Sequence, residues 1–373
     1  MMLFPFPCAM FQNIEGNAPK TGDSPMKHIQ VLPIEDGGNP RTQDDIVETA
    51  GSFLIRPFSE DGDANYKFRF DVELISSSNE PVPVDFTIEW ADAEYAKFRR
   101  YMLLSRNDSW QRIPAEISGT TAHAVVQAPP GRSQLGMHPP FNYTRLQTLV
   151  QELDLAVFTS RSIGRSLQGR EIYAVEAGLP GKRPLVITAR VHPYESIGSF
   201  MTLGMIEWLG GRSAEAAGIM QNHRIVILPM PNPDGVAAGF CKRTIGGLDI
   251  NNAATSAEPE GIALAAFFRA MKPMASFDIH GFMHNSDGFG TNDIRRGQAI
   301  ANHLLTRPDL FNKKLGVHES QDTEGGLSNL GCMAQHEFGS VRFGGSWSWY
   351  DRDSAHLRAM GVEILKAYTG QFS

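Results

Sequence analysis

Cysteine is scarce in this sequence. Only three occur among 373 residues, Cys8, Cys241 and Cys332, and no two of them form a C-x-x-C motif. This spacing excludes a disulfide framework and a thiolate zinc site. A reducing cytoplasm is therefore the expected location.

Basic residues are too few for a nucleic-acid partner. Lys and Arg number 34 against 41 Asp and Glu, so the net charge is -7 and no phosphate-binding surface is expected. The apolar opening segment MMLFPFPCAMFQ does not predict a membrane span, because it is interrupted by Pro5 and Pro7 and is too short to cross a bilayer. We therefore expect no nucleic-acid and no membrane partner, and self-association as a homo-oligomer is left open.

The first third of the sequence carries strand patterns and no convincing amphipathic helix. Residues 67–74 and 82–90 alternate apolar and polar side chains, as half-buried strands do, and the turn-rich segment between them predicts a hairpin. Further strand-like pieces occur near 101–105 and 122–127. These patterns predict a small antiparallel β-sandwich.

Pro and Gly concentrate at residues 128–140, where the periodicity changes. After this segment, apolar strand-like runs alternate with helical patterns, which is typical of an α/β sheet. We therefore predict a mobile or lightly packed N-terminus at 1–26, a β-sandwich domain at 27–135 and a larger α/β domain at 136–373.

Three residues of the second unit have the types and positions of a metal site. His192 and Glu195 directly follow the run PLVITARV, and His280 ends the run ASFDIH. Strand ends of an open α/β sheet meet at the edge where ligands bind. Two histidine nitrogens and one carboxylate, with one position left for water, are the ligands expected of hydrolytic zinc. Taken alone, the pair His192 and Glu195 is more often an ordinary polar pair of a protein surface than a ligand set, and His280 alone would fit a hydrogen-bonded histidine of the core.

This set, together with NPDGV and GLDINN, resembles the M14 family of zinc carboxypeptidases, and within it the cytosolic carboxypeptidase branch. The segment from WQRIP to HPPFNYTRL is similar to the β-sandwich that precedes the catalytic domain in that branch. The resemblance implies a mixed, mainly parallel eight-stranded sheet between helices, and one Zn²⁺ bound by His192, Glu195 and His280. It also implies a metallocarboxypeptidase, which hydrolyses the C-terminal bond of a peptide or peptide-like substrate with metal-activated water.

The resemblance further implies a glutamate that acts as general base. Glu337 in CMAQHEFGS lies where the family keeps this residue, on a late strand before the final helix, and Glu324 in DTEGG is the rival position. Glu337 is preferred because it ends an apolar run, whereas Glu324 lies among glycines and polar residues.

Substrate contacts are expected at Arg243, Asn251 and Asn252. Arg243 would stabilise the oxyanion, although a gap-free alignment from Asp249 places Lys242 at that position, so the assignment is good to one residue. Asn251 keeps the family's substrate-binding asparagine. Asn252 replaces the arginine that pairs with the substrate's terminal carboxylate, and this puts exopeptidase specificity in question.

Other assignments stay open at this point. Arg295 or Arg296 could supply the charge that Asn252 lacks. The chain could also be an M14-like amidohydrolase acting on an acylated amino acid or a cell-wall peptide. A third alternative is a metal-holding protein without catalysis, in which the acidic first unit recruits a partner.

Overall fold

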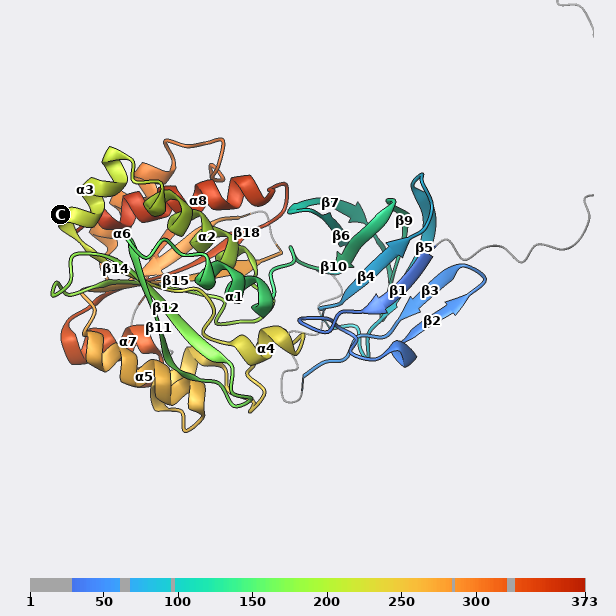
Figure 1. The fold of residues 1–373 in the computed structure, drawn as a ribbon, viewed down its shortest axis with the longest axis horizontal. Helices are drawn as coiled ribbons and strands as arrows, with labels where there is room; N and C mark the ends of the chain where they lie inside the picture. The colour runs from blue at the N-terminus through green and yellow to red at the C-terminus, as the bar shows by residue number, and fades with distance from the viewer. Residues whose placement is uncertain (1–28, 61–67, 95–97, 284–285, 321–325, 373) are drawn as a thin grey trace, which may run out of the picture.

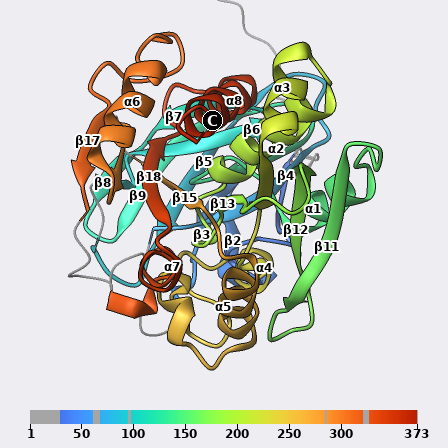
Figure 2. The ribbon, with the colours of Figure 1, turned by 90° about the vertical axis from the view of Figure 1, so that its left-hand side faces the viewer.

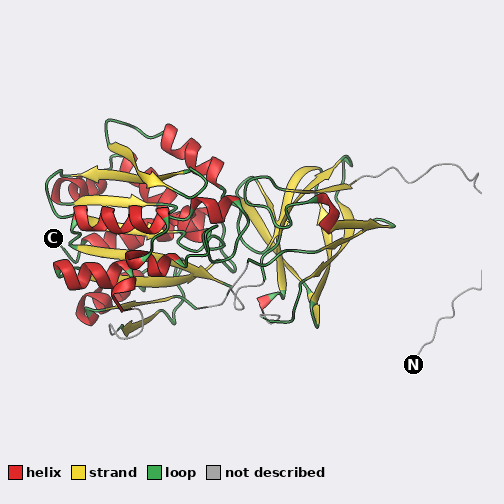
Figure 3. Cartoon of the chain, turned by 90° about the horizontal axis from the view of Figure 1, so that it is seen from below, coloured by secondary structure: helices red, strands yellow, loops and turns green. Residues whose placement is uncertain are grey.

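A computed structural model describes residues 29–60, 68–94, 98–283, 286–320 and 326–372. The predicted N-terminal segment at 1–26 lies outside the described residues. A unit built of strands lies beside a larger unit of strands and helices (Figure 1). Figure 3 shows the same two parts from below, with the helices in red almost confined to the larger unit.

The smaller unit contains two five-stranded sheets among the described residues. One sheet has the order β1-β4-β10-β6-β7, formed by β1 (Ile29–Pro33), β4 (Asp71–Ser76), β10 (Gly131–Gly136), β6 (Tyr101–Arg106) and β7 (Ser109–Pro114). The other has the order β2-β3-β5-β9-β8, formed by β2 (Ile46–Thr49), β3 (Ser52–Ile55), β5 (Val82–Glu89), β9 (Thr121–Ala128) and β8 (Glu116–Ser118). All pairings are antiparallel except that of β3 with β5.

The predicted hairpin between the first two strand patterns is wrong, because β4 and β5 belong to opposite sheets. Both strands present a buried face, and their apolar side chains share one core instead of one ladder. Phe70, directly before β4, and Trp90, directly after β5, meet edge to face with ring centroids 6.2 Å apart. Alternation alone cannot distinguish partners in one sheet from partners across a sandwich.

The larger unit is built on an eight-stranded sheet, as the resemblance implied. Its strands are β11 (Phe158–Arg165), β12 (Glu171–Gly178), β14 (Arg224–Leu228), β13 (Leu185–Ala189), β15 (Ala275–Phe282), β18 (Val341–Ser348), β16 (Gly288–Thr291) and β17 (Gly316–Glu319), in that spatial order. The central strands β14, β13, β15 and β18 run parallel, and so do β16 and β17. Strand β13 is buried at every position, as the centre of a parallel sheet requires.

Helices cover both faces of this sheet (Figure 2). One face carries α2 (Ile197–Gly210), α3 (Ala214–Asn222), α6 (Ile294–Leu304) and α8 (Ser354–Thr369), and the other carries α5 (Pro259–Met271) and α7 (Leu330–Phe338). The remaining helical segments include α1 (Tyr143–Gln151), α4 (Pro233–Ala237) and the 3-10 segments η3 (Ile250–Thr255) and η4 (Gly326–Ser328). Asp353 caps α8, with its side chain accepting from the His356 amide.

The run CMAQHEFGS is a helix and not the predicted strand. Asn329 caps α7 by accepting from two amides, and the buried residues Leu330, Met333 and Ala334 recur with helical spacing. Gly339 then ends the helix with a left-handed φ of 67°. The late strand before the final helix is therefore β18, which begins at Val341.

Candidate metal centre

His192 and Glu195 come from the turn that connects β13 to α2. After Ala189 the chain bends at Arg190, whose φ of 62° is left-handed, and the Glu195 amide then donates to the His192 carbonyl over 3.1 Å. This tight turn presents both side chains to the same place, and both are buried. His280 reaches that place from β15 on the adjacent, parallel strand.

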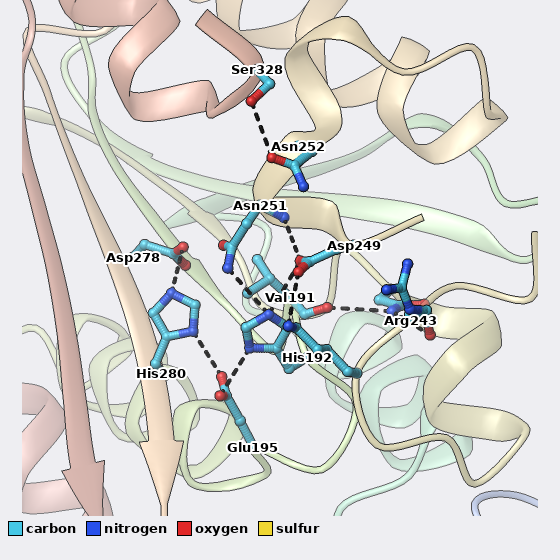
Figure 4. Close-up of polar contacts among 12 residues, drawn as sticks. Val191, His192, Glu195, Arg243, Asp249, Asn251, Asn252, Asp278, His280 and Ser328 are labelled. Carbon is cyan, nitrogen blue, oxygen red and sulfur yellow. Dashed lines mark hydrogen bonds and ion pairs between the residues drawn. The ribbon is translucent and has the colours of Figure 1, made fainter. Parts of the chain in front are cut away.

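The structure brings His192, Glu195 and His280 together (Figure 4). His192 Nδ1 lies 2.9 Å from one Glu195 oxygen, and His280 Nδ1 lies 2.9 Å from the other. One potential ligand atom from each residue lies within 4.8 Å of the others. Two ring nitrogens and a carboxylate at this spacing can converge on one small cation.

The opposite nitrogen of each ring is also held. His192 Nε2 lies 3.3 Å from Asp249 Oδ1 and 3.2 Å from Asn251 Nδ2, and His280 Nε2 lies 3.0 Å from Asp278 Oδ2. Asp278 is itself fixed, since Thr188 Oγ1 donates to its second oxygen over 2.6 Å. Carboxylates in these positions set the tautomer and orientation of metal-binding histidines, leaving Nδ1 for the ion.

The electrostatics of the cluster also favour a cation. Burial lowers the pKa of His192, but the Glu195 charge and the contacts with Asp249 and Glu195 outweigh it and raise that pKa to about 9. The pKa of His280 is also raised well above its usual value, because Asp278 and Glu195 outweigh burial. Burial alone would raise the pKa of Glu195, yet the two histidines lower it to about 2. At neutral pH the metal-free cluster therefore holds protons that a metal ion can replace.

A cavity of about 450 Å³ adjoins the cluster. Asp278 and His280 of β15 and Arg342 and Gly344 of β18 line it. Residues of η3, α5 and the start of α7 also line it. A cavity of this size beside a ligand cluster can hold a substrate side chain or terminal group.

At Gly344, β18 presents no side chain to the cavity. This residue pairs with Asp278 in the sheet, and a Cβ atom added to it would meet nothing within 4 Å. Its neighbour Gly345 faces the other way, where a Cβ would lie 3.0 Å from Trp347 Nε1 and 3.1 Å from the Phe289 Cβ. Packing therefore explains the second glycine, whereas the first leaves space on the cavity side.

Glu337 does not join the cluster. It lies in the last turn of α7 and pairs with Arg269 of α5 at 3.2 Å. Arg183 donates to the carbonyls of Phe338 and Lys272, so the end of α7 lies near the amino ends of β13 and β15. The ligand cluster lies toward the carboxyl ends of these strands. The prediction of Glu337 as a strand residue beside the metal is thus wrong, and Glu324 lies outside the described residues.

Of the two adjacent cations, Lys242 reaches the surroundings of the cluster. Lys242 Nζ lies 3.2 Å from Asp249 Oδ2, next to His192. The Arg243 guanidinium instead donates to the Gly247 carbonyl over 2.8 Å. The geometry favours Lys242 over Arg243 for a cation near the metal.

Asn251 and Asn252 both line the cavity. The Asn252 side chain accepts from the Ser328 hydroxyl over 3.0 Å. Arg296, a suggested replacement for the missing arginine, pairs with Asp293 and donates to the Gln371 carbonyl, so it belongs to another part of the fold.

Arg342, which the sequence did not single out, does line the cavity. Its guanidinium donates to Gln335 Oε1 over 2.9 Å, to the Ser320 hydroxyl over 3.1 Å and to the Ser320 carbonyl over 2.7 Å. These partners hold the positive charge at the side of the cavity beside Gly344. Asp278 was also missed, although its position two residues before His280 places both on one face of a strand.

The comparisons with known proteins agree with this fold. The family described as zinc carboxypeptidase, M14 peptidases, matches residues 146–251. Cytosolic carboxypeptidase 2 of Danio rerio is 33% identical over 263 residues, which cover 61% of this chain and 36% of that protein. Cytosolic carboxypeptidase 6 of Mus musculus is 31% identical over 122 residues, or 30% of this chain and 23% of that protein. The chain thus spans about a third or less of these two relatives.

Solved structures resemble almost the whole chain. A metallo-carboxypeptidase from Burkholderia cenocepacia has a TM-score of 0.75 at 19% identity, over 92% of this chain and 100% of that one. A metallo-carboxypeptidase from Pseudomonas aeruginosa has a TM-score of 0.76 at 17% identity, over 92% and 99%. At these identities the likeness establishes the fold. Within the described part of the chain, the helices are too short or too polar to cross a bilayer. The family match, the relatives and the fold agree, and residues 146–251 of this chain match the zinc carboxypeptidase domain of the M14 family.

Proposed function

We propose that this protein is a zinc-dependent metallopeptidase that hydrolyses the C-terminal bond of a peptide or peptide-like substrate. The observation that carries the proposal is the convergence of His192 Nδ1, His280 Nδ1 and the Glu195 carboxylate, with both Nε2 atoms held by aspartates. The match of residues 146–251 to the zinc carboxypeptidase family and the adjoining cavity support it. The comparisons favour a peptidase over the amidohydrolase and over the binding protein without catalysis.

The three ligand residues would hold one Zn²⁺. The fit rests on the donor set of two imidazole nitrogens and one carboxylate, which is the set of hydrolytic zinc sites. When bound, the ion would polarise the scissile carbonyl and lower the pKa of an attacking water. Asp249 and Asp278 keep the rings of His192 and His280 in the orientation that binding requires.

The cavity would receive the terminal part of the substrate. Asn251 and Asn252 offer amide groups, and Arg342 offers a cation, to the polar groups of that terminus. Lys242, beside Asp249, is the described cation best placed to stabilise negative charge that develops near the centre. The role of Glu324 as proton acceptor stays a prediction.

We also propose a domain boundary at residues 135 and 136 and a cytoplasmic location. The boundary is supported by the end of β10 at Gly136 and the start of α1 at Tyr143. The location is supported by the names of the curated relatives. Self-association has no support in the structure or the comparisons, and it is not part of the proposal.

The test is a hydrolysis assay of zinc-loaded and metal-stripped protein on free-acid peptides, amidated peptides and acyl-amino acids. The proposal predicts zinc-dependent release of a C-terminal residue from free-acid peptides. Zinc-dependent cleavage of acyl-amino acids alone would favour the amidohydrolase. Stoichiometric zinc binding without turnover of any substrate would favour a binding protein.

A further inference from the structure

A carboxylate of the β-sandwich unit enters the larger unit behind the metal centre. Glu60 follows β3 and is 9% exposed. Its Oε2 accepts from the Cys241 amide over 2.5 Å, and its Oε1 accepts from the Lys242 amide over 2.5 Å and the Arg243 amide over 2.9 Å. Three consecutive amides thus surround one carboxylate, which is the arrangement of a backbone anion nest.

The segment 241–243 contacts the metal-binding turn through its backbone. The Cys241 carbonyl accepts from the amide of Tyr194, the residue before Glu195, over 3.2 Å. The Asn232 side chain donates to the Arg243 carbonyl over 3.1 Å and to the Val191 carbonyl over 3.3 Å. A shift of the segment would therefore displace the backbone on both sides of His192, at Val191 and at Tyr194.

A side chain of the same segment makes a second connection to the centre. Lys242 Nζ lies 3.2 Å from Asp249 Oδ2, and Asp249 Oδ1 lies 3.3 Å from His192 Nε2. Figure 4 shows Asp249 directly against the His192 ring. The path from Glu60 to this ligand thus passes through Lys242 and Asp249.

Other residues of the sandwich unit hold the carbonyls that precede the segment. Arg69, which is 2% exposed, donates to the Phe240 carbonyl and pairs with Asp71 at 2.8 Å. Arg41 donates to the Ala238 carbonyl over 3.0 Å. Glu60 accepts hydrogen bonds from the amides of residues 241–243, and the two arginines donate to the carbonyls of Phe240 and Ala238. The smaller unit therefore fixes both the amides and the carbonyls of the backbone around residue 240.

We propose that Glu60 is a positioning residue of the metal centre, through which the β-sandwich unit fixes segment 241–243 and, with it, the turn and the histidine that bind the ion. The identity of the ion rests on the proposed function. The assignment goes beyond that function because it gives the smaller unit a role in metal binding.

The experiment compares Glu60→Gln, Glu60→Asp and Glu89→Gln in the full chain. Glutamine has nearly the same shape but no charge, and its amide nitrogen cannot accept from the backbone. Aspartate keeps the charge but is one methylene shorter. Glu89→Gln makes the same change on an exposed carboxylate of the same unit, which pairs with Arg56 at 2.8 Å, and is the matched control.

Three quantities are measured on each protein: the dissociation constant for Zn²⁺ alone, the visible spectrum of the Co²⁺-substituted protein, and amide hydrogen exchange across residues 191–196 and 240–243. Glu60→Gln should weaken Zn²⁺ binding at least about tenfold, as loss of a group that orients ligands does. It should also shift the Co²⁺ spectrum and speed exchange in both segments. Glu60→Asp should recover part of each effect, and Glu89→Gln should match the unmodified protein.

Adding Lys242→Met tests the path. Because both changes act on the same ligand, their combined effect on Zn²⁺ binding should be smaller than the product of the single effects. A folded Glu60→Gln protein with Zn²⁺ affinity within twofold and an unchanged Co²⁺ spectrum would overturn the proposal. If Glu60→Gln does not fold, the same unchanged values in Glu60→Asp would overturn it.

These readouts separate this proposal from the proposed function. An unmodified protein that binds Zn²⁺ without hydrolysing peptides would contradict the peptidase and leave the comparison of Glu60 variants intact. If the unmodified protein binds no Zn²⁺, hydrogen exchange in the metal-free proteins decides. Faster exchange at 191–196 in Glu60→Gln would then support positioning of the turn, and equal exchange would overturn it.

Discussion

Asp278 Oδ2 lies 3.0 Å from His280 Nε2, on the side of the ring away from the 2.9 Å contact between His280 Nδ1 and Glu195. This relationship leaves one nitrogen of His280 for the metal and commits the other to a carboxylate. His192 has the corresponding arrangement with Asp249 and Glu195. Both rings are thus oriented before an ion arrives, which lowers the entropic cost of binding it.

Asp278→Asn should weaken Zn²⁺ binding about 10- to 100-fold, because an amide holds the His280 ring less firmly than a carboxylate does. A titration against a chelator of known affinity measures the change. Asp85→Asn is the matched control, since Asp85 contacts His123 at 3.2 Å on the surface of the smaller unit. Equal Zn²⁺ affinity in Asp278→Asn and the unmodified protein would show that Asp278 does not orient the ligand.

Glu337→Gln should retain metal content and hydrolysis within about twofold. Glu337 pairs with Arg269 near the amino ends of β13 and β15, whereas the candidate ligands lie toward the carboxyl ends of these strands. Glu324→Gln is the informative comparison for the general base. Steady-state kinetics on a free-acid peptide, at equal zinc content, separates the two variants. A large loss of kcat in Glu337→Gln alone would contradict the placement of α7.

Gly344→Glu should raise hydrolysis at least about tenfold, because general-base catalysis contributes about 10²- to 10⁴-fold and the described residues of β18 present no carboxylate to the cavity. The substitution should fold, since a Cβ at Gly344 meets nothing within 4 Å. Gly344→Gln adds the same bulk without a proton acceptor, and it should give no gain. Unchanged or lower kcat in Gly344→Glu with full zinc occupancy would show that a carboxylate at this position of β18 cannot act as a general base.

Asn252→Arg should improve kcat/KM for free-acid peptides by about one to two decades, since a hydrogen bond to a charged group contributes roughly 1.5 to 3 kcal/mol. Amidated peptides should not gain. If instead the variant turns over free acids more slowly, a cation already serves the cavity. Arg342→Gln should then selectively weaken free-acid substrates, and the absence of that effect would contradict both explanations.

The sequence predicted the proximity of the three candidate ligands better than it predicted the groups around them. His192, Glu195 and His280 follow apolar runs, and strand ends of an α/β sheet converge, so their proximity follows from pattern and topology. The placement of Glu337 on a strand was wrong, because the apolar run around it, with buried Leu330, Met333 and Ala334, is too short to distinguish a helix from a strand by composition.

The orienting contacts depend on tertiary geometry that sequence patterns do not carry. Asp249 lies 57 positions from His192, and Glu60 lies 181 positions from Cys241, so no local spacing predicts either contact. The strand hairpin was mispredicted for a similar reason, because β4 and β5 have the same alternation but belong to different sheets.

The most direct test of a catalytic metal centre is a parallel measurement of Zn²⁺ binding and peptide hydrolysis for the unmodified protein and His192→Ala. We predict one equivalent of Zn²⁺ in the unmodified protein after dialysis against a mild chelator, and zinc-dependent release of a C-terminal residue. His192→Ala should lose both, because removal of one of three ligands leaves the ion too weakly held. Full zinc occupancy in His192→Ala, or hydrolysis that persists in both proteins after the metal is stripped, would contradict the account.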